Sequence, residues 1–258
     1  MKIGILQLNS QLDPKTNLEK IKSYASKIKN EGVVALFLPE YFYSFSAQGS
    51  TPFVDPLEDI CQLARTLGVF LVGGSAVTKV GDRLYNRAYN ISPNGELLSY
   101  YDKINLFVCN LQSASYDESK HYTGGTSQTL LTLEGHEDFT IGMSLCFDLR
   151  FPEHFRSMSG RGANVLSIAA AFTVPTGLAH WHTLVRARAI ENQAYVIAAA
   201  QCGVVTCNST RKETFGHSLV VDPWGEVLID AGASEEGPWF CDLQRSLIDD
   251  VRSRMKVL

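Results

Sequence analysis

The chain has 258 residues, of which 45% are hydrophobic and 19% charged, and this size predicts a single domain over residues 1–258 with one large buried core. Its net charge of −4 argues against nucleic acid as the main partner, because binding phosphate requires a basic surface. Every apolar run is shorter than the roughly 18 residues that a membrane-spanning helix needs, so we expect no membrane association.

The first residues and the cysteines together predict a cytoplasmic protein. Met1 leads directly into a strand-like alternation, and no signal peptide is visible. The six cysteines are scattered along the chain, a pattern typical of reduced thiols rather than of a disulfide framework. Cys202 and Cys207 lie close together, but no second pair or suitably spaced histidines complete a zinc site, and we therefore expect no metal.

The first third of the chain alternates between strand and helix patterns. The predicted strands and helices occupy residues 2–8, 14–30, 33–38, 56–67 and 69–74, in the order strand, helix, strand, helix, strand. This order favours an α/β layered fold. The first helix carries four lysines, which we interpret as a solvated face rather than a binding patch: Lys20, Lys22, Lys27 and Lys29.

A hairpin and a long loop follow. Residues 85–91 and 97–101 flank the turn sequence SPNG and read as two paired strands. Residues 105–127 are rich in Ser, Asn and Gly and show no clear period. A loop of this length in a compact domain is usually functional.

The second half repeats the pattern of the first. Strands are predicted at 128–133, 139–145, 164–168 and 195–201, and helices at about 152–161 and 179–193. A second hairpin, 218–221 with 226–230, surrounds the turn DPWG. The turns SPNGE and DPWGE each follow two strand–helix units, which indicates two similar halves. Such halves can pack sheet on sheet with helices outside, as a four-layer α-β-β-α sandwich within one domain.

Cys146 is the candidate nucleophile. It lies where a buried strand ends, shortly before Pro152 begins a helix. A nucleophilic cysteine needs a base or a cation beside it, and Glu40 and Lys103 also follow strands, whose ends commonly line a pocket. Taken singly, each of the three is more often a solvated turn residue or a core residue. A cysteine–histidine pair also stays open, with three candidate partners: His121, His154 and His217.

Three stretches resemble the catalytic motifs of the nitrilase, or carbon–nitrogen hydrolase, superfamily. They are residues 38–42 (LPEYF), 101–107 (YDKINLF) and 144–153 (SLCFDLRFPE). The resemblance implies a homodimer without metal or organic cofactor. It also implies catalytic roles for four residues: Glu40 as general base, Lys103 as oxyanion stabiliser, Cys146 as nucleophile and Glu118 as a second glutamate.

Four later stretches are similar to the deaminated-glutathione amidase branch of that superfamily: residues 171–181, 186–191, 198–203 and 216–225. This similarity implies a cysteine-dependent amidase that hydrolyses a small carboxylated amide through a thioester. Five residues are expected to bind the substrate, the last of them in a turn at 177–180: Phe147, Phe172, Thr173, Tyr116 and His180. Plain core packing is the alternative for Phe172. Two other functions stay open, an ω-amidase acting on α-ketoglutaramate-type monoamides and a catalytically silent scaffold.

Overall fold

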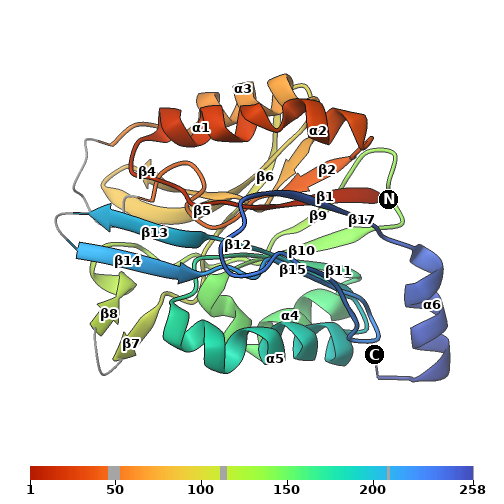
Figure 1. Cartoon of the computed structure of the whole chain (residues 1–258). Coiled ribbons are helices and arrows are strands. Elements are labelled where there is room, and N and C mark those ends of the chain that lie inside the picture. The colour runs from red at the N-terminus through yellow and green to blue at the C-terminus, as the bar shows by residue number, and fades with distance from the viewer. Residues whose placement is uncertain (46–52, 111–114, 208–209, 258) are drawn as a thin grey trace.

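The computed structural model describes residues 1–45, 53–110, 115–207 and 210–257, with the side chains of Cys207 and Thr210 left out. Two β-sheets lie face to face at its centre, with helices on both outer sides (Figure 1). None of the described helices is long and apolar enough to span a bilayer.

The first sheet has the strand order β17-β1-β2-β3-β5-β4, and β6 pairs with β5. Its strands are β1 Lys2–Gln7, β2 Ala35–Phe37, β3 Phe70–Val72, β4 Ser75–Val80, β5 Arg83–Ile91, β6 Leu97–Asp102 and β17 Gly237–Asp242. The strands β1, β2 and β3 run parallel, as strands joined by helices do. Their carboxyl ends therefore meet at one edge of the sheet.

The second sheet has the strand order β16-β15-β12-β11-β10-β9. Its strands are β9 Leu130–Thr132, β10 Thr140–Leu145, β11 Val165–Ala170, β12 Tyr195–Ala200, β15 Leu219–Val221 and β16 Val227–Asp230. Again the three central strands, β10, β11 and β12, are parallel. The two halves of the chain thus build sheets of the same design, each with a hairpin at an edge.

Three apolar cores separate the four layers. One lies between the sheets, a second between the first sheet and helices α1 to α3, and a third between the second sheet and helices α4 and α5. The helices are α1 Pro14–Ser23, α2 Ala25–Asn30, α3 Leu57–Leu67, α4 Pro152–Gly160, α5 Val174–Asn192 and α6 Arg245–Arg254. The predicted four-layer α-β-β-α sandwich is confirmed.

The predicted helix over residues 14–30 is in fact two helices. Asp13 caps the first, as its sequence suggests, by accepting from the backbone N–H groups of Lys15 and Thr16. The Ser23 hydroxyl then donates to the Lys20 carbonyl at 2.6 Å, and the Tyr24 N–H bonds to Ile21 instead. A serine hydroxyl that competes for a backbone carbonyl in this way ends the first helix.

The sequence patterns also missed several elements. The hairpin of β13 Cys202–Cys207 and β14 Thr210–Phe215 was not predicted, nor were β4, β17 and α6. Helix α5 begins at Val174, five residues before its predicted start, with a proline in its first turn. The loop 105–127 contains the short strands β7 Val108–Asn110 and β8 Ser115–Asp117 and a 3₁₀ turn, Glu118–Lys120, while its residues 111–114 lie outside the described part.

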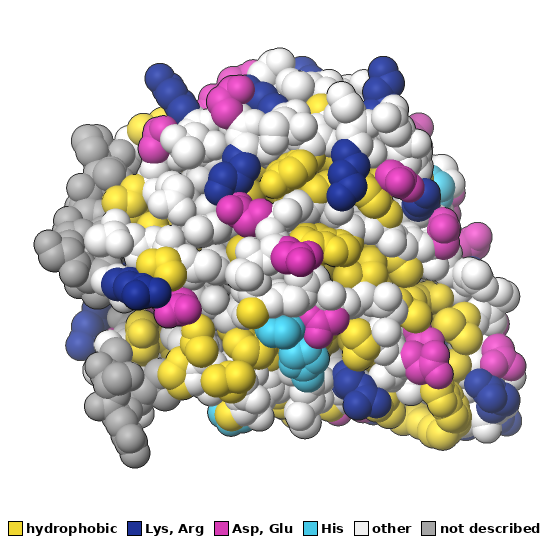
Figure 2. Space-filling view, in the orientation of Figure 1, with side chains coloured by type: hydrophobic (Ala, Val, Ile, Leu, Met, Phe, Trp, Pro, Cys, Tyr) yellow, Lys and Arg dark blue, Asp and Glu magenta, His cyan; other side chains and the backbone are white. Residues whose placement is uncertain are grey.

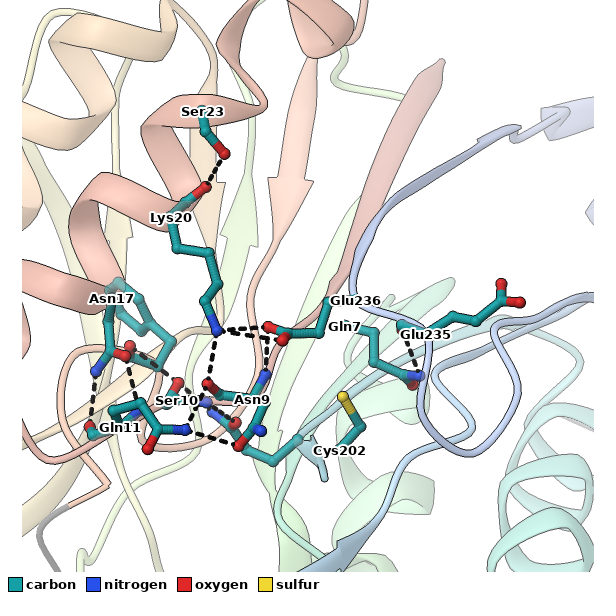
Figure 3. Close-up of polar contacts among 12 residues, drawn as sticks. Gln7, Asn9, Ser10, Gln11, Asn17, Lys20, Ser23, Cys202, Glu235 and Glu236 are labelled. Carbon is teal, nitrogen blue, oxygen red and sulfur yellow. Dashed lines mark hydrogen bonds and ion pairs between the residues drawn. The ribbon is translucent and has the colours of Figure 1, made fainter. Parts of the chain in front are cut away.

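A polar cluster joins the end of β1 to helix α1 and to the loop before β17 (Figure 3). The Lys20 ammonium donates to the Asn9 carbonyl at 3.0 Å and pairs with Glu236 at 2.8 Å. Glu236 also accepts from the Asn9 backbone N–H. One of the four lysines of the predicted solvated face therefore holds the two ends of the chain together.

Candidate active site

Glu40, Lys103 and Cys146 converge at one end of the sandwich. Glu40 follows β2 and Lys103 follows β6 in the first sheet, whereas Cys146 follows β10 in the second. The Lys103 ammonium lies 3.0 Å from Glu40 Oε1, and Cys146 lines the same pocket and shifts the pKa of Glu40. Glu40 and Lys103 are almost fully buried, and Cys146 is 9% exposed. The two sheets thus each contribute part of one charged cluster.

Glu118 is the fourth member of this cluster. Its Oε2 lies 2.8 Å from the Lys103 ammonium and accepts the Phe107 N–H, while its Oε1 accepts from the Tyr41 hydroxyl at 3.0 Å. Glu118 comes from the 3₁₀ turn in the loop 105–127 rather than from a sheet. That loop therefore supplies the second carboxylate beside the Lys103 ammonium.

Two buried amides position Glu40, and neither was predicted as a site residue. The Asn86 side chain, on β5, donates to Glu40 Oε1 at 2.8 Å. The Gln201 side chain, at the end of β12, donates to the Glu40 carbonyl at 2.9 Å. Glu40 Oε1 therefore accepts from both Asn86 and Lys103, and this fixes the plane of its carboxylate.

The backbone at Cys146 is in the left-handed region, with φ of 44°, which is uncommon for a residue with a side chain. The sharp turn begins a 3₁₀ helix, Cys146–Arg150. The buried Asp148 carboxylate secures this turn by accepting the Leu145 N–H at 2.8 Å and the Tyr101 hydroxyl at 2.7 Å. It also accepts both the backbone and the side-chain N–H groups of Asn105. Residues near the turn are therefore held by a network that reaches both sheets.

The burial of the cluster shifts its pKa values. Desolvation raises the pKa of Glu40 above its ordinary value despite the Lys103 cation. Desolvation and the Glu40 carboxylate raise the pKa of Cys146 well above its ordinary value, and Lys103 opposes them only in part. Burial alone would lower the pKa of Lys103, but Glu118 and Glu40 raise it well above its ordinary value, so the amine stays charged. The Lys103 cation therefore does not outweigh burial and the Glu40 charge at the Cys146 thiol.

The cluster forms the floor of a pocket of about 170 Å³. Four of the predicted substrate-binding residues line it: Tyr116, Phe147, Phe172 and Thr173. The fifth, His180, is absent from the described lining and contacts Arg150 instead, at 3.2 Å. The turn that we expected at 177–180 is part of helix α5, which carries His180 past the pocket. Phe172 has both of the roles weighed for it, because it lines the pocket and packs on Trp181.

The unpredicted β13–β14 hairpin supplies part of the pocket wall, through Arg211, Lys212, Glu213 and Thr214. Residues 210–215 read TRKETF and show no alternation of polar and apolar residues, so the usual strand signal was missing there. The described lining contains no histidine. His121, His154 and His217 therefore do not pair with Cys146. Cys202, considered for zinc, is buried with a pKa raised to about 12, and the Cys207 side chain lies outside the described residues.

The sequence profile of the carbon–nitrogen hydrolase family matches residues 2–253. This chain belongs to the carbon–nitrogen hydrolases. It is an amidase, a hydrolase of carbon–nitrogen bonds other than peptide bonds.

Two relatives and one solved structure match this carbon–nitrogen hydrolase over more than nine tenths of their length. A deaminated glutathione amidase from Synechocystis is 35% identical, with 98% of this chain and 95% of the relative aligned. An omega-amidase from Mus musculus is 31% identical, with 100% of this chain and 93% of the relative aligned. The crystal structure of Nit3 from Saccharomyces cerevisiae, described as a member of branch 10 of the nitrilase superfamily, superposes with a TM-score of 0.84 at 26% identity, covering 100% of this chain and 94% of that one.

Proposed function

We propose that this hydrolase is a cysteine-dependent amidase that converts a small carboxylated amide, deaminated glutathione, into the acid and ammonia through a thioester on Cys146. The observation that carries the proposal is the convergence of the Cys146 thiol, the buried Glu40 carboxylate and the buried Lys103 ammonium on one pocket, with 3.0 Å between the two charged groups. Glu40, Lys103 and Cys146 form the catalytic triad of this proposal, and Glu118 assists it.

The charges of the cluster favour proton transfer within it. A free thiolate would add a negative charge to a buried site that already holds Glu40, Glu118 and only one ammonium. Transfer of the thiol proton to Glu40 creates the thiolate without changing the net charge. The raised pKa of Glu40 makes it a stronger base for this transfer. The nucleophile is therefore formed only when Glu40 accepts its proton.

In the first half of the reaction, the Cys146 sulfur attacks the amide carbon, and the carbonyl oxygen becomes an oxyanion. The Lys103 ammonium and the backbone N–H of Phe147 stabilise this negative charge. Glu40, now an acid, gives its proton to the amide nitrogen as the carbon–nitrogen bond breaks. Ammonia leaves, and the acyl group stays on sulfur as a thioester.

In the second half, Glu40 is again a carboxylate and takes a proton from a water molecule that attacks the thioester carbon. The carbon–sulfur bond breaks, the acid leaves, and the proton returns to the Cys146 sulfur. Glu118 keeps Lys103 charged and in place through both steps, because it lies 2.8 Å from the ammonium. The loop that carries Glu118 thereby takes part in the chemistry.

Arg150 supports a carboxylated substrate. Its guanidinium lines the pocket over the rings of Phe147 and Phe172, at 5.7 and 5.4 Å. Within the described part of the chain no carboxylate lies within ion-pair distance of it, so a substrate carboxylate can pair with it.

The charge of Arg150 can be tested by Arg150→Gln. We expect this variant to raise KM for a carboxylated amide by about tenfold, the loss of about 1.4 kcal/mol that a charged hydrogen bond can supply. Turnover of the uncharged amide propionamide serves as the control and should change little. An equal loss for both amides would contradict a carboxylate-binding role.

The substrate is tested by an ammonia-release assay on deaminated glutathione and α-ketoglutaramate. The choice of the first amide rests on the higher identity to a deaminated glutathione amidase, 35% against 31%, and on the stretch AAAQCG at 198–203. We expect a higher kcat/KM for deaminated glutathione and no turnover by Cys146→Ala, which should keep its fold. Better turnover of α-ketoglutaramate would replace our choice with ω-amidase.

The likeness to the mouse omega-amidase supports ω-amidase as the second candidate. A catalytically silent scaffold is the third, and the convergence of Glu40, Lys103 and Cys146 argues against it. Intact-mass spectrometry separates the third candidate from the other two. A thioester adduct on Cys146 during turnover supports an amidase, whereas the absence of any adduct and of ammonia release with both amides supports a scaffold.

We further propose a cytoplasmic homodimer. Apolar side chains exposed on α5 and on the β15–β16 hairpin support a subunit contact there: Leu178, Ile190, Trp224, Val227 and Leu228. Five described cysteines are free, which suits a reducing compartment. Light scattering of the purified protein should give twice the mass of the chain, and a monomer would contradict the proposal.

A further inference from the structure

Outside the pocket, two histidines and an aspartate meet at the surface. His182 lies on α5, His217 precedes β15 and Asp230 ends β16. His182 Nε2 is 3.0 Å from Asp230 Oδ2, and His217 Nδ1 is 2.8 Å from Asp230 Oδ1. Donor atoms of all three residues lie within 4.8 Å of one another. Figure 2 shows histidine side chains beside an acidic one in the lower part of the face that it draws.

The backbone and one aromatic ring hold this cluster in place. Asp230 Oδ1 accepts the Gly232 N–H at 2.9 Å, and the His217 N–H donates to the Gly232 carbonyl at 2.8 Å. The ring of Phe215 stacks on His217, with 4.5 Å between centroids, and meets the edge of His182. His217 itself has a left-handed backbone, with φ of 54°. Both imidazoles are therefore fixed on either side of the carboxylate.

The cluster is open to solvent. Between a third and two fifths of the His182 and Asp230 side chains are exposed, and about a quarter of His217, so ions reach the cluster from solvent.

Two imidazoles and a carboxylate are the ligands of a zinc-type ion. Imidazole nitrogen favours Zn²⁺ and its transition-metal neighbours, whereas Mg²⁺ and Ca²⁺ prefer oxygen ligands only. Zn²⁺ bonds to His nitrogen and Asp oxygen are about 2.0–2.2 Å long, so the donors of a tetrahedral site lie about 3.3 Å apart. The observed contacts of 3.0 and 2.8 Å run to different oxygens of Asp230, and one ligand atom from each residue lies within 4.8 Å of the others, which is near enough for such a site. A metal ion would replace the hydrogen atoms now shared between these donors after small side-chain shifts, with water as a fourth ligand.

We propose that His182, His217 and Asp230 bind one Zn²⁺ ion. The ion joins three segments, α5, the connection from β14 to β15 and the end of β16. Trp181, next to His182, donates to the His217 carbonyl at 2.7 Å and packs on Phe172 of the pocket wall, with 4.7 Å between ring centroids. The proposed metal therefore braces the helix behind the substrate pocket without touching the reacting atoms.

The test measures Zn²⁺ binding by isothermal titration calorimetry in the Cys146→Ala background, which removes the pocket thiol as a competing ligand. We expect one ion per chain and a higher melting temperature with Zn²⁺ than without it. His182→Gln and Asp230→Asn, each added to this background, should weaken binding by at least about tenfold. Co²⁺ in place of Zn²⁺ should give the visible absorption of a tetrahedral site, and both variants should lose it.

His136→Gln is the matched control, because His136 is a partly exposed histidine in the turn between β9 and β10, in a different part of the chain. It should bind Zn²⁺ as tightly as its Cys146→Ala parent. The proposal is wrong if His182→Gln binds as tightly as the parent, or if the parent binds no Zn²⁺. Circular dichroism of each variant shows whether it is folded, so that a loss of Zn²⁺ binding is not mistaken for a loss of folding. This result is independent of amide turnover.

Discussion

Replacing Asn86 by leucine removes a neutral side chain that donates to the Glu40 carboxylate. The Asn86 amide lies 2.8 Å from Glu40 Oε1, and both side chains are buried. Leucine has the same branched skeleton and cannot donate, so the carboxylate loses a charge-assisted hydrogen bond. Because that bond stabilises only the charged form, the pKa of Glu40 should rise further above its ordinary value.

The magnitude follows from two opposing contributions. A hydrogen bond to a charged group contributes about 1.5–3 kcal/mol. Against this, Asn86 Oδ1 is buried without a hydrogen-bond partner among the described residues, and leucine removes that desolvation cost of about 1–3 kcal/mol. The fold should therefore lose little stability. Removing the desolvation cost of Asn86 Oδ1 does not help the reaction, however, because it stabilises the fold and not the transition state. A loss of about 1.4 kcal/mol of transition-state stabilisation lowers the rate tenfold.

The assay is the pH dependence of kcat/KM. Glu40 has to be ionised to accept the thiol proton, so a higher pKa moves the acid limb of the profile to higher pH. We expect Asn86→Leu to be about tenfold slower at pH 7 and to recover part of this loss as the pH rises.

Asn90→Leu is the matched control for this prediction. Asn90 is a buried asparagine on the same strand, and its side chain bonds to Gly73 and Ser99 rather than to Glu40. The Asn90→Leu substitution should lower the free energy of unfolding and leave the acid limb of the pH profile in place. A profile for Asn86→Leu that keeps its acid limb, or that moves together with the control, would refute the positioning of Glu40 by Asn86.

Two further substitutions test how the pocket is built. Tyr101→Phe removes one of the donors to the buried Asp148, so the free energy of unfolding should fall by about 2 kcal/mol and the melting temperature by about 2–4 °C for each kcal/mol; an unchanged melting curve would show that Asp148 does not depend on it. Gly177→Ala places a methyl group 2.1 Å from Phe215 and should destabilise the protein by about 1–3 kcal/mol or more, whereas Gly160→Ala, which meets nothing within 4 Å, should not; equal melting temperatures for the two would contradict this packing argument.

The sequence predicted the layers well because their signals are local. The apolar runs that become β10, β11 and β12 are buried strands in the structure, and the turns SPNG and DPWG join hairpins as expected. The position of Cys146 after a strand also followed from the sequence. Its association with Glu40 and Lys103 did not follow from spacing, because each of the three is common at strand ends. Motif resemblance supplied that association.

The remaining features depend on contacts between distant residues. Asn86 and Gln201 reach Glu40 from 46 and 161 positions away, and nothing near either residue in the chain marks such a contact. His180 was misplaced because helix α5 begins earlier than the apolar pattern suggests. The raised pKa of the Cys146 thiol could not be predicted from the sequence for a similar reason. Its pKa depends on how deeply the cluster is buried, and burial is a property of the assembled sandwich.

The assignment of the triad to two different sheets has a consequence for how this enzyme fails. Glu40 and Lys103 follow strands of one sheet and Cys146 a strand of the other, and the inner core, together with the hydrogen bonds from Tyr101 to Asp148 and from Gln201 to Glu40, sets the gap between them. A small slip of that core, far too small to expose it to water, would separate sulfur from carboxylate. Mild heating or a conservative substitution such as Met143→Leu should therefore stop the reaction before any spectroscopic sign of melting. The catalytic rate thus reports on the spacing between the two packed sheets.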